Sequence, residues 1–126
     1  MGENKVLIVD DDVDLLILLK LELSAWGYSV FTATSGEAGL RFAKEKHPDV
    51  IVLDIMLPGL SGGEVAETLK TDPATKDIPV IFLTCLYSKG EEAALGNLIH
   101  GNVIIAKPFE SKELLEEIEK HLAKKV

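Results

Sequence analysis

The sequence predicts an α/β fold, in which helices cover both faces of a parallel sheet. Five short apolar runs rich in Val and Ile recur along the chain, and such runs are typical of strands that are buried on both faces. Between these runs, apolar residues recur at helical spacing. Strands that alternate with helices form right-handed βαβ units, and such units build a parallel sheet.

Each expected element follows from the position of an apolar run or of a helical pattern. The strands are expected at residues 5–9, 28–33, 50–53, 79–84 and 103–106. The helices are expected over about residues 13–26, 34–46, 61–71, 88–100 and 111–122. This alternation favours a single flavodoxin-like, doubly wound (βα)5 domain with the strand order 2-1-3-4-5.

Capping residues mark the ends of the expected helices. Three capping boxes, in which a Ser or Thr and a Glu satisfy each other's backbone donors, are Thr34 with Glu37, Ser61 with Glu64, and Ser88 with Glu91. Asp12 is expected to cap the first helix and Ser111 the last. Gly27 is expected to end the first helix as its C′ residue.

Length and composition indicate how many domains the chain forms and which partners it is expected to lack. The chain is expected to form one domain over residues 1–126. Its formal net charge of −8 opposes direct binding to nucleic acid. It has no apolar run of membrane-spanning length, so we expect no membrane contact. The single cysteine, Cys85, cannot form an internal disulfide, which fits a cytoplasmic location.

Polar residues stand at the carboxyl ends of the expected strands. In a sheet of this order, ligands bind beyond these ends, in the crevice between strands one and three. Asp10 and Asp11 end strand one, and Asp54 ends strand three. Thr84 ends strand four, and Lys107 follows strand five. The fold should therefore bring three carboxylates, a hydroxyl and an amine together at one edge of the sheet.

Taken singly, each of these residues has a simpler explanation. The aspartates could cap the first helix, and Thr84 and Lys107 could be ordinary strand-end and surface residues. Their convergence favours a shared role. Clustered carboxylates raise each other's pKa values, and Mg²⁺, which prefers oxygen ligands, removes that penalty. A metal, a lysine and a hydroxyl around a free carboxylate suit phosphoryl transfer, with the carboxylate as nucleophile.

Four segments of the chain carry a resemblance to a known family. They are residues 7–11, residues 53–58 together with Gly62, residues 83–84 and residues 107–109. In this order and at this spacing, they make the sequence similar to the response-regulator receiver domain (CheY-like, from two-component signalling) over essentially its whole length.

The resemblance implies a phosphorylation-dependent signalling switch. Asp54 would accept a phosphoryl group from a histidine kinase or a histidine phosphotransfer protein. Thr84 would bond the phosphoryl oxygens in the active state, and Lys107 would pair with the phosphoryl group. The Lys107-Pro108 peptide bond is expected to be cis. The domain would be no enzyme in the usual sense, although it would catalyse its own phosphorylation and slow dephosphorylation.

The resemblance also implies a Mg²⁺ site. Asp11 would bind the ion directly, Asp10 through a water molecule and Met56 through its backbone carbonyl. Asp54, the phosphoacceptor, would complete the set.

Some positions depart from the family pattern. Many receivers carry Tyr or Phe three residues before the lysine, where this chain has Ile104, and residues 101–107 are one residue shorter than usual. A downstream protein target is nevertheless expected at the face of the fourth helix, fifth strand and fifth helix. Met56 and Leu86 flank the expected path of a hydrolytic water. They cannot orient this water by hydrogen bonding and are bulky enough to cover the phosphoryl group, so the phosphorylated state should be long-lived.

Two other functions fit the sequence less well. A small aspartyl-phosphate phosphatase needs a second Asp two residues after the nucleophile, where this chain has Met56. A receiver-like interaction module that needs no phosphorylation would not require the complete acidic set. The chain could act alone, as a relay intermediate, or as part of a larger regulator or hybrid kinase.

Overall fold

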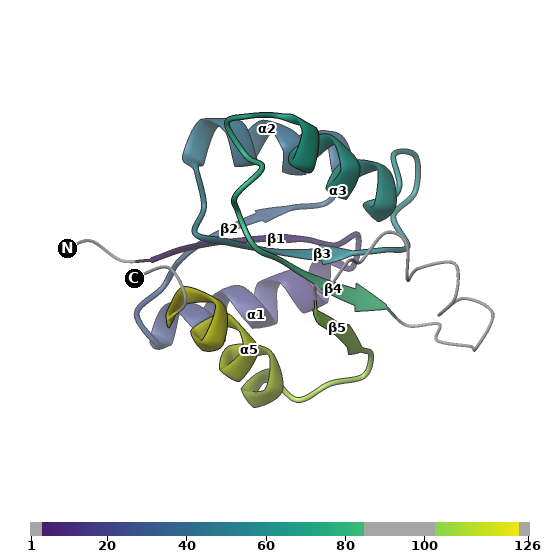
Figure 1. Ribbon diagram of the computed structural model, residues 1–126. Coiled ribbons are helices and arrows are strands. Elements are labelled where there is room, and N and C mark those ends of the chain that lie inside the picture. The colour runs from purple at the N-terminus through teal and green to yellow at the C-terminus, as the bar shows by residue number, and fades with distance from the viewer. Residues whose placement is uncertain (1–3, 85–102, 124–126) are drawn as a thin grey trace.

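A five-stranded parallel sheet forms the centre of the protein. Figure 1 shows the computed structural model, which describes residues 4–84 and 103–123. The strands are β1 (Lys5–Val9), β2 (Ser29–Ala33), β3 (Val50–Asp54), β4 (Val80–Thr84) and β5 (Val103–Ala106). Their order, β2-β1-β3-β4-β5, is the predicted one, and every neighbouring pair is parallel.

Two layers of helices enclose the sheet. The described helices are α1 (Val13–Ala25), α2 (Gly36–Lys46), α3 (Gly62–Thr71) and α5 (Ser111–Ala123). In Figure 1, α2 and α3 cover one face of the sheet, while α1 and α5 cover the other. This arrangement is the predicted doubly wound, flavodoxin-like fold. The helix expected around residues 88–100, with its capping box, lies outside the described residues.

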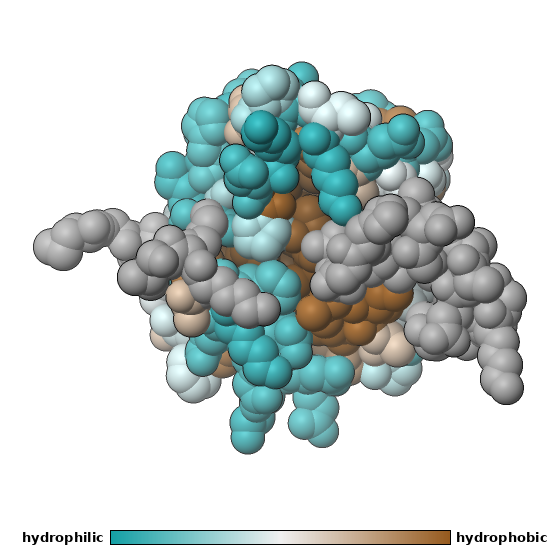
Figure 2. All heavy atoms as spheres, viewed as in Figure 1, coloured by the Kyte–Doolittle hydropathy of each residue, from teal (hydrophilic) through white to brown (hydrophobic). Residues whose placement is uncertain are grey.

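The sheet divides the core into two clusters, because successive side chains of a strand point to opposite faces. In β1, Val6 and Ile8 pack with α1 and α5, whereas Leu7 and Val9 pack towards α2 and α3. Every residue of β3 and β4 is buried. Figure 2 shows the apolar residues (brown) around β4 and β5, between the hydrophilic outer surfaces of the two helix layers.

The start and end of α1 follow the predictions. The Leu15 N–H donates to Asp12 Oδ1 over 3.2 Å, so Asp12 is the N-cap. Gly27 follows the C-cap residue Trp26 with a φ of +97°, in the left-handed region that glycine adopts without strain.

The predicted capping boxes have different outcomes. Ser61 and Glu64 form theirs at the start of α3. The prediction for α2 is wrong by one position. Ser35 is its N-cap and accepts the Ala38 N–H over 3.2 Å, so Glu37 stands too early in the helix to complete a box.

The start of α5 also differs from the prediction. Ser111 is already the first residue of the helix and therefore does not occupy the cap position. The Glu113 N–H donates to the Glu110 carbonyl over 2.9 Å, which places the first turn one residue earlier than expected.

The outer side of α1 is unusually apolar. Leu16, Leu19 and Leu23 are buried against the sheet and α5. Other large apolar side chains are 49–67% exposed, namely Val13, Ile17, Leu18, Leu21 and Trp26. Among the described residues, no helix has both the length and the apolar character needed to span a membrane.

Candidate functional site

The register of the sheet brings the predicted site residues to one edge. Asp10 directly follows β1, and Asp54 is the last residue of β3. Thr84 is the last residue of β4, where it is level with Ala106 of β5, and Lys107 comes next. Because parallel strands end at the same edge of a sheet, the residues converge there as predicted.

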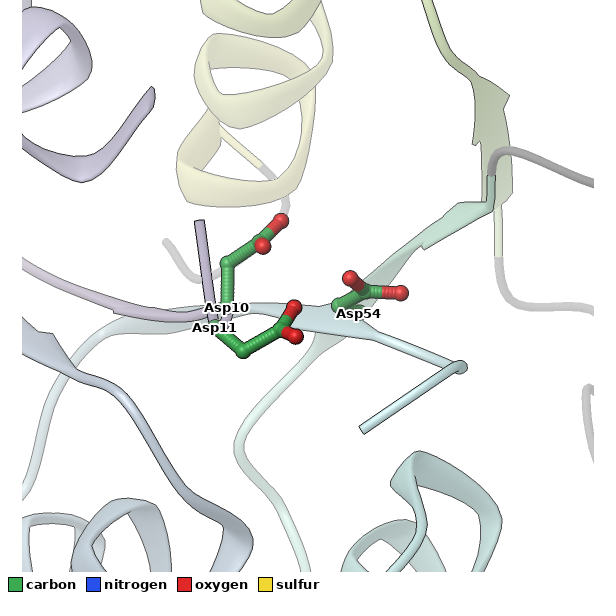
Figure 3. Close-up of side chains that lie close together, drawn as sticks. All are labelled: Asp10, Asp11 and Asp54. Carbon is green, nitrogen blue, oxygen red and sulfur yellow. The ribbon is translucent and has the colours of Figure 1, made fainter. Parts of the chain in front are cut away.

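Three carboxylates form the acidic part of the site. Asp10 and Asp54 are 0% and 3% exposed, whereas Asp11 is exposed to solvent. One oxygen from each lies within 4.8 Å of the others, and Figure 3 shows the three side chains grouped at the ends of β1 and β3. Oxygen ligands at this separation suit a hard divalent cation.

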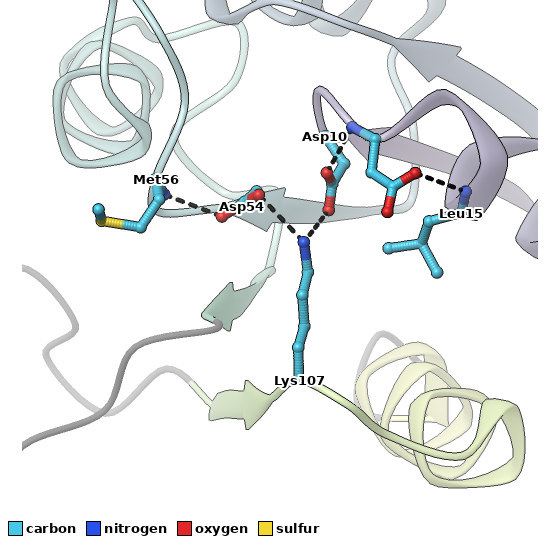
Figure 4. A network of polar contacts seen from close by, with 6 residues as sticks. Asp10, Leu15, Asp54, Met56 and Lys107 are labelled. Atoms are coloured by element: carbon cyan, nitrogen blue, oxygen red, sulfur yellow. Dashed lines mark hydrogen bonds and ion pairs between the residues drawn. The ribbon is translucent and has the colours of Figure 1, made fainter.

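Lys107 bridges the two buried carboxylates. Its Nζ lies 2.6 Å from Asp10 Oδ2 and 3.1 Å from Asp54 Oδ2 (Figure 4). The backbone N–H of Lys107 also donates to the Thr84 carbonyl over 2.7 Å, which ties the end of β5 to β4. The Lys107-Pro108 bond is cis, as predicted.

The other oxygens of the buried carboxylates accept backbone N–H groups. Asp54 Oδ1 accepts the Met56 N–H over 2.8 Å, and Asp10 Oδ1 accepts the Asp12 N–H over 2.9 Å. Each buried carboxylate therefore has one oxygen bonded to the backbone and the other to Lys107. These bonds offset the cost of burying charge at the end of an apolar strand.

Burial and the contacts within the site shift the pKa values of Asp10 and Lys107. Burial raises the pKa of Asp10, and the charge of Asp54 raises it further, while hydrogen bonds from Lys107 and Asp12 act in the opposite direction. Burial alone would lower the pKa of Lys107, but its bonds to Asp10 and Asp54 outweigh this effect and raise it. The amine is therefore protonated at neutral pH, and the three carboxylates still exceed its single positive charge.

Met56 and Thr84 also lie at this edge. The Met56 backbone reaches Asp54 through its N–H, but its side chain is 51% exposed and points away from Asp54 in Figure 4. Thr84 is buried, with 1% of its surface exposed. The structure thus brings together the backbone or side chains of all six predicted residues: Asp10, Asp11, Asp54, Met56, Thr84 and Lys107.

Gly62 has a positioning role that the sequence did not reveal. Its N–H donates to the Ile55 carbonyl over 3.1 Å. A Cβ atom at Gly62 would overlap the Asp54 carbonyl oxygen and lie 2.6 Å from the Ile55 Cα. The first turn of α3 therefore packs directly on the backbone of Asp54. The sequence marked Gly62 only as part of the family resemblance and gave no physical reason for a glycine there.

Comparison with known proteins identifies the family. The sequence profile of the response regulator receiver domain matches residues 6–119. The chain belongs to this family. It is thus a receiver domain of the kind found in two-component systems. This receiver domain is 37% identical over 114 residues to the probable transcriptional regulator ycf27 of Porphyridium aerugineum, covering 90% of the chain and 46% of that protein.

Two further comparisons agree. The receiver domain is 38% identical over 113 residues to the alkaline phosphatase synthesis transcriptional regulatory protein PhoP of Bacillus subtilis, covering 88% of the chain and 45% of that protein. A putative response regulator from Chloroflexus aurantiacus superposes with a TM-score of 0.86 at 34% identity, covering 97% of this chain and 99% of that one. The receiver domain therefore spans less than half the length of the two transcriptional regulators.

Proposed function

We propose that this receiver domain is a phosphorylation-dependent switch whose phosphoacceptor is Asp54. The observation that carries the proposal is the position of this carboxylate. It is buried at the end of a central strand, within 3.1 Å of a lysine amine and close to two further carboxylates. The donor would be a phosphohistidine of a histidine kinase or of a histidine phosphotransfer protein.

The proposed transfer requires charge neutralisation and alignment more than acid–base chemistry. An Asp54 oxygen forms the new bond to phosphorus while the bond between phosphorus and the donor's imidazole nitrogen breaks, and that electron pair returns to the nitrogen. Lys107 already lies against Asp54 Oδ2 and would neutralise charge on the transferred group. Thr84, at the end of the neighbouring strand, would donate its hydroxyl to a phosphoryl oxygen.

Mg²⁺ is the proposed cofactor, and the donor set fits it. Asp10, Asp11 and Asp54 offer oxygens within 4.8 Å of one another, and such a set of clustered carboxylates is favoured by a nearby cation. We propose that these carboxylates hold the ion together with the Met56 carbonyl. When bound, Mg²⁺ would offset the negative charge that accumulates around the phosphoryl oxygens.

The phosphoacceptor is tested by mass spectrometry. Incubation with acetyl phosphate and Mg²⁺ should add one phosphoryl group to the wild type and none to Asp54→Asn. Asp77→Asn is the matched control, because Asp77 is an exposed carboxylate remote from the acidic group. Equal labelling of Asp54→Asn and wild type would show that another residue is the acceptor.

The metal site is tested by calorimetry with Mg²⁺. We expect millimolar to sub-millimolar affinity, because the protein supplies few ligands. Asp11→Ala should weaken binding by roughly tenfold or more. Asp14→Ala removes a nearby exposed carboxylate outside the acidic group and should leave the affinity unchanged. If the two variants bind Mg²⁺ equally well, Asp11 is not a ligand.

The proposed output surface comprises the fourth helix, β5 and α5. The helix expected around residues 88–100 lies outside the described residues. The strand β5 is the edge strand of the sheet and carries Ile104, half-buried, where many receivers have an aromatic residue. Amide exchange with and without beryllofluoride should change in β5 and α5. Changes confined to α1 and α2 would contradict this assignment.

A further inference from the structure

A groove runs between α1 and α5, on the helix layer below the sheet in Figure 1. Its volume is about 520 Å³, which is within the range of sites that bind ligands or side chains. Leu23 and Leu115 line it as buried apolar residues. Trp26, at the end of α1, forms a wall and is 67% exposed, so its ring is available for contact.

The rim of this groove is acidic. Glu22 of α1 and Glu116 and Glu119 of α5 line it, against one basic residue, Lys112. Among the residues that the structure describes, these three glutamates take part in no ion pair. The pKa of Tyr28 is raised by burial, and the negative charge of Glu119 raises it further.

We propose that this groove binds a basic amphipathic helix of a partner protein. The apolar face of such a helix would fill the space above Leu23 and Leu115, and its Lys or Arg side chains would meet Glu22, Glu116 and Glu119. A cation could also lie over the exposed face of Trp26. Both walls are helices whose backbone groups are already paired, so recognition falls to side chains, as in helix-in-groove complexes.

The acidic rim of the groove favours a basic helix over a second copy of this chain, nucleic acid or anionic lipid. In a two-fold dimer the same patch would face itself and bring glutamates against glutamates. Nucleic acid and anionic lipid carry phosphates, which the acidic rim repels. The groove residues include none of the phosphoacceptor or metal-site residues, so the inference goes beyond the proposed function and does not depend on it.

Trp26 provides the measurement, because it is the only tryptophan of the chain. The probe is a synthetic Leu/Lys amphipathic peptide of about 18 residues, long enough to form a helix, and without tryptophan. Its titration into the intact protein should shift Trp26 emission to shorter wavelength with micromolar, saturable binding. A peptide with Glu in place of Lys, and one of the same composition in shuffled order, should not.

A charge-reversed pair of variants locates the binding site. Glu116→Lys with Glu119→Lys should weaken peptide binding by roughly tenfold or more. The control, Glu45→Lys with Glu67→Lys, makes the same change in net charge on α2 and α3, which lie on the other face of the sheet. It should weaken binding by less than about threefold, because distant surface charges are screened by salt.

Several results would overturn the proposed binding of a basic helix. An unchanged Trp26 spectrum, or equal weakening by the two variant pairs, would overturn it, since the peptide would then avoid the groove or respond only to net charge. Sedimentation provides a second test. A concentration-dependent dimer abolished only by the Glu116/Glu119 reversal would assign the groove to a second copy of this chain and would also overturn the proposal. Circular dichroism checks that each variant is folded.

Discussion

At the scale of single residues, Lys107 decides the electrostatic state of the site. It is the basic residue that pairs with both Asp10 and Asp54, and its side chain is 17% exposed. Without this amine, two buried carboxylates would face each other with only backbone N–H groups to stabilise them. We therefore expect Lys107 to stabilise the fold through these two ion pairs.

Replacement of Lys107 should expose this dependence. Lys107→Gln should lower the free energy of unfolding by roughly 1–3 kcal/mol in the absence of Mg²⁺, because buried charges lose their partner. Added Mg²⁺ should restore part of the loss. Urea unfolding with and without Mg²⁺ measures both effects. Lys112→Gln, at an exposed position of α5, should change stability by less than about 0.5 kcal/mol. Indistinguishable stabilities of the two variants would refute this role.

Met56 should control the lifetime of the phosphorylated state. Its side chain points away from Asp54, so in this structure it does not cover the carboxylate. What remains of the prediction is its chemistry, since a thioether cannot orient a water molecule as an amide can. Leu86, the second residue expected to flank the water, lies outside the described residues.

The corresponding experiment compares two substitutions of Met56. Met56→Asn should accelerate hydrolysis of phospho-Asp54 roughly 10- to 100-fold, equivalent to about 1–3 kcal/mol of transition-state stabilisation. Met56→Leu, which cannot hold a water by hydrogen bonding, should remain as slow as wild type. The loss of the added phosphoryl mass with time gives both rates, and equal rates for the two variants would exclude this mechanism.

At the scale of elements, the start of α3 acts as a support for the end of β3. The capping box of Ser61 and Glu64 closes the first turn, and Gly62 brings that turn against the backbone of Asp54. Asp54, the proposed phosphoacceptor, is thus held from its own strand and from the helix that follows it.

A methyl group at this contact should disturb both stability and function. In Gly62→Ala the new Cβ would meet backbone atoms, which cannot rotate away as a flexible side chain can. The free energy of unfolding should fall by about 1–3 kcal/mol, and labelling by acetyl phosphate should slow. Lys70→Ala, on the exposed side of the same helix, serves as the control and should preserve both properties. Normal labelling of folded Gly62→Ala would show that this contact does not position Asp54.

At the scale of the whole molecule, patterns of apolar residues were sufficient to predict the sheet. The runs in β1, β3 and β4 are buried on both faces, so their hydrophobicity left little choice of structure. The same prediction brought the strand-end residues to one edge. That convergence, together with the family resemblance, anticipated the acidic group and Lys107.

Features decided by tertiary packing were harder to predict. Thr34 and Ser35 both belong to the residue types that cap helices, and the choice between them was wrong by one position. The backbone at Gly36 also lies so close to Val65 and the Leu60 carbonyl that a Cβ would clash with them, and a local sequence rule cannot detect such a contact. The bond from Lys107 to Asp10 was likewise missed, because the resemblance assigned the lysine to a phosphoryl group.

The Asp10–Lys107 ion pair has a consequence for synthesis on the ribosome. Its partners are 97 positions apart, and Lys107 follows Asp54 by 53. At about 5–20 residues per second, roughly 3–10 s separate the synthesis of Asp54 from that of Lys107. A nascent chain whose β1 and β3 have already paired therefore brings its carboxylates together before their counter-charge exists.

During that interval, we expect Mg²⁺ to supply the counter-charge at the proposed metal site. Arrested nascent chains that end just before Lys107 should resist protease better in Mg²⁺ than in a chelator, and Asp54→Asn should reduce the difference. Chains long enough to expose Lys107 outside the ribosome should depend on Mg²⁺ far less. If the protease resistance of nascent chains of both lengths depends equally on Mg²⁺, then Lys107 does not replace Mg²⁺ as the counter-charge of the carboxylates.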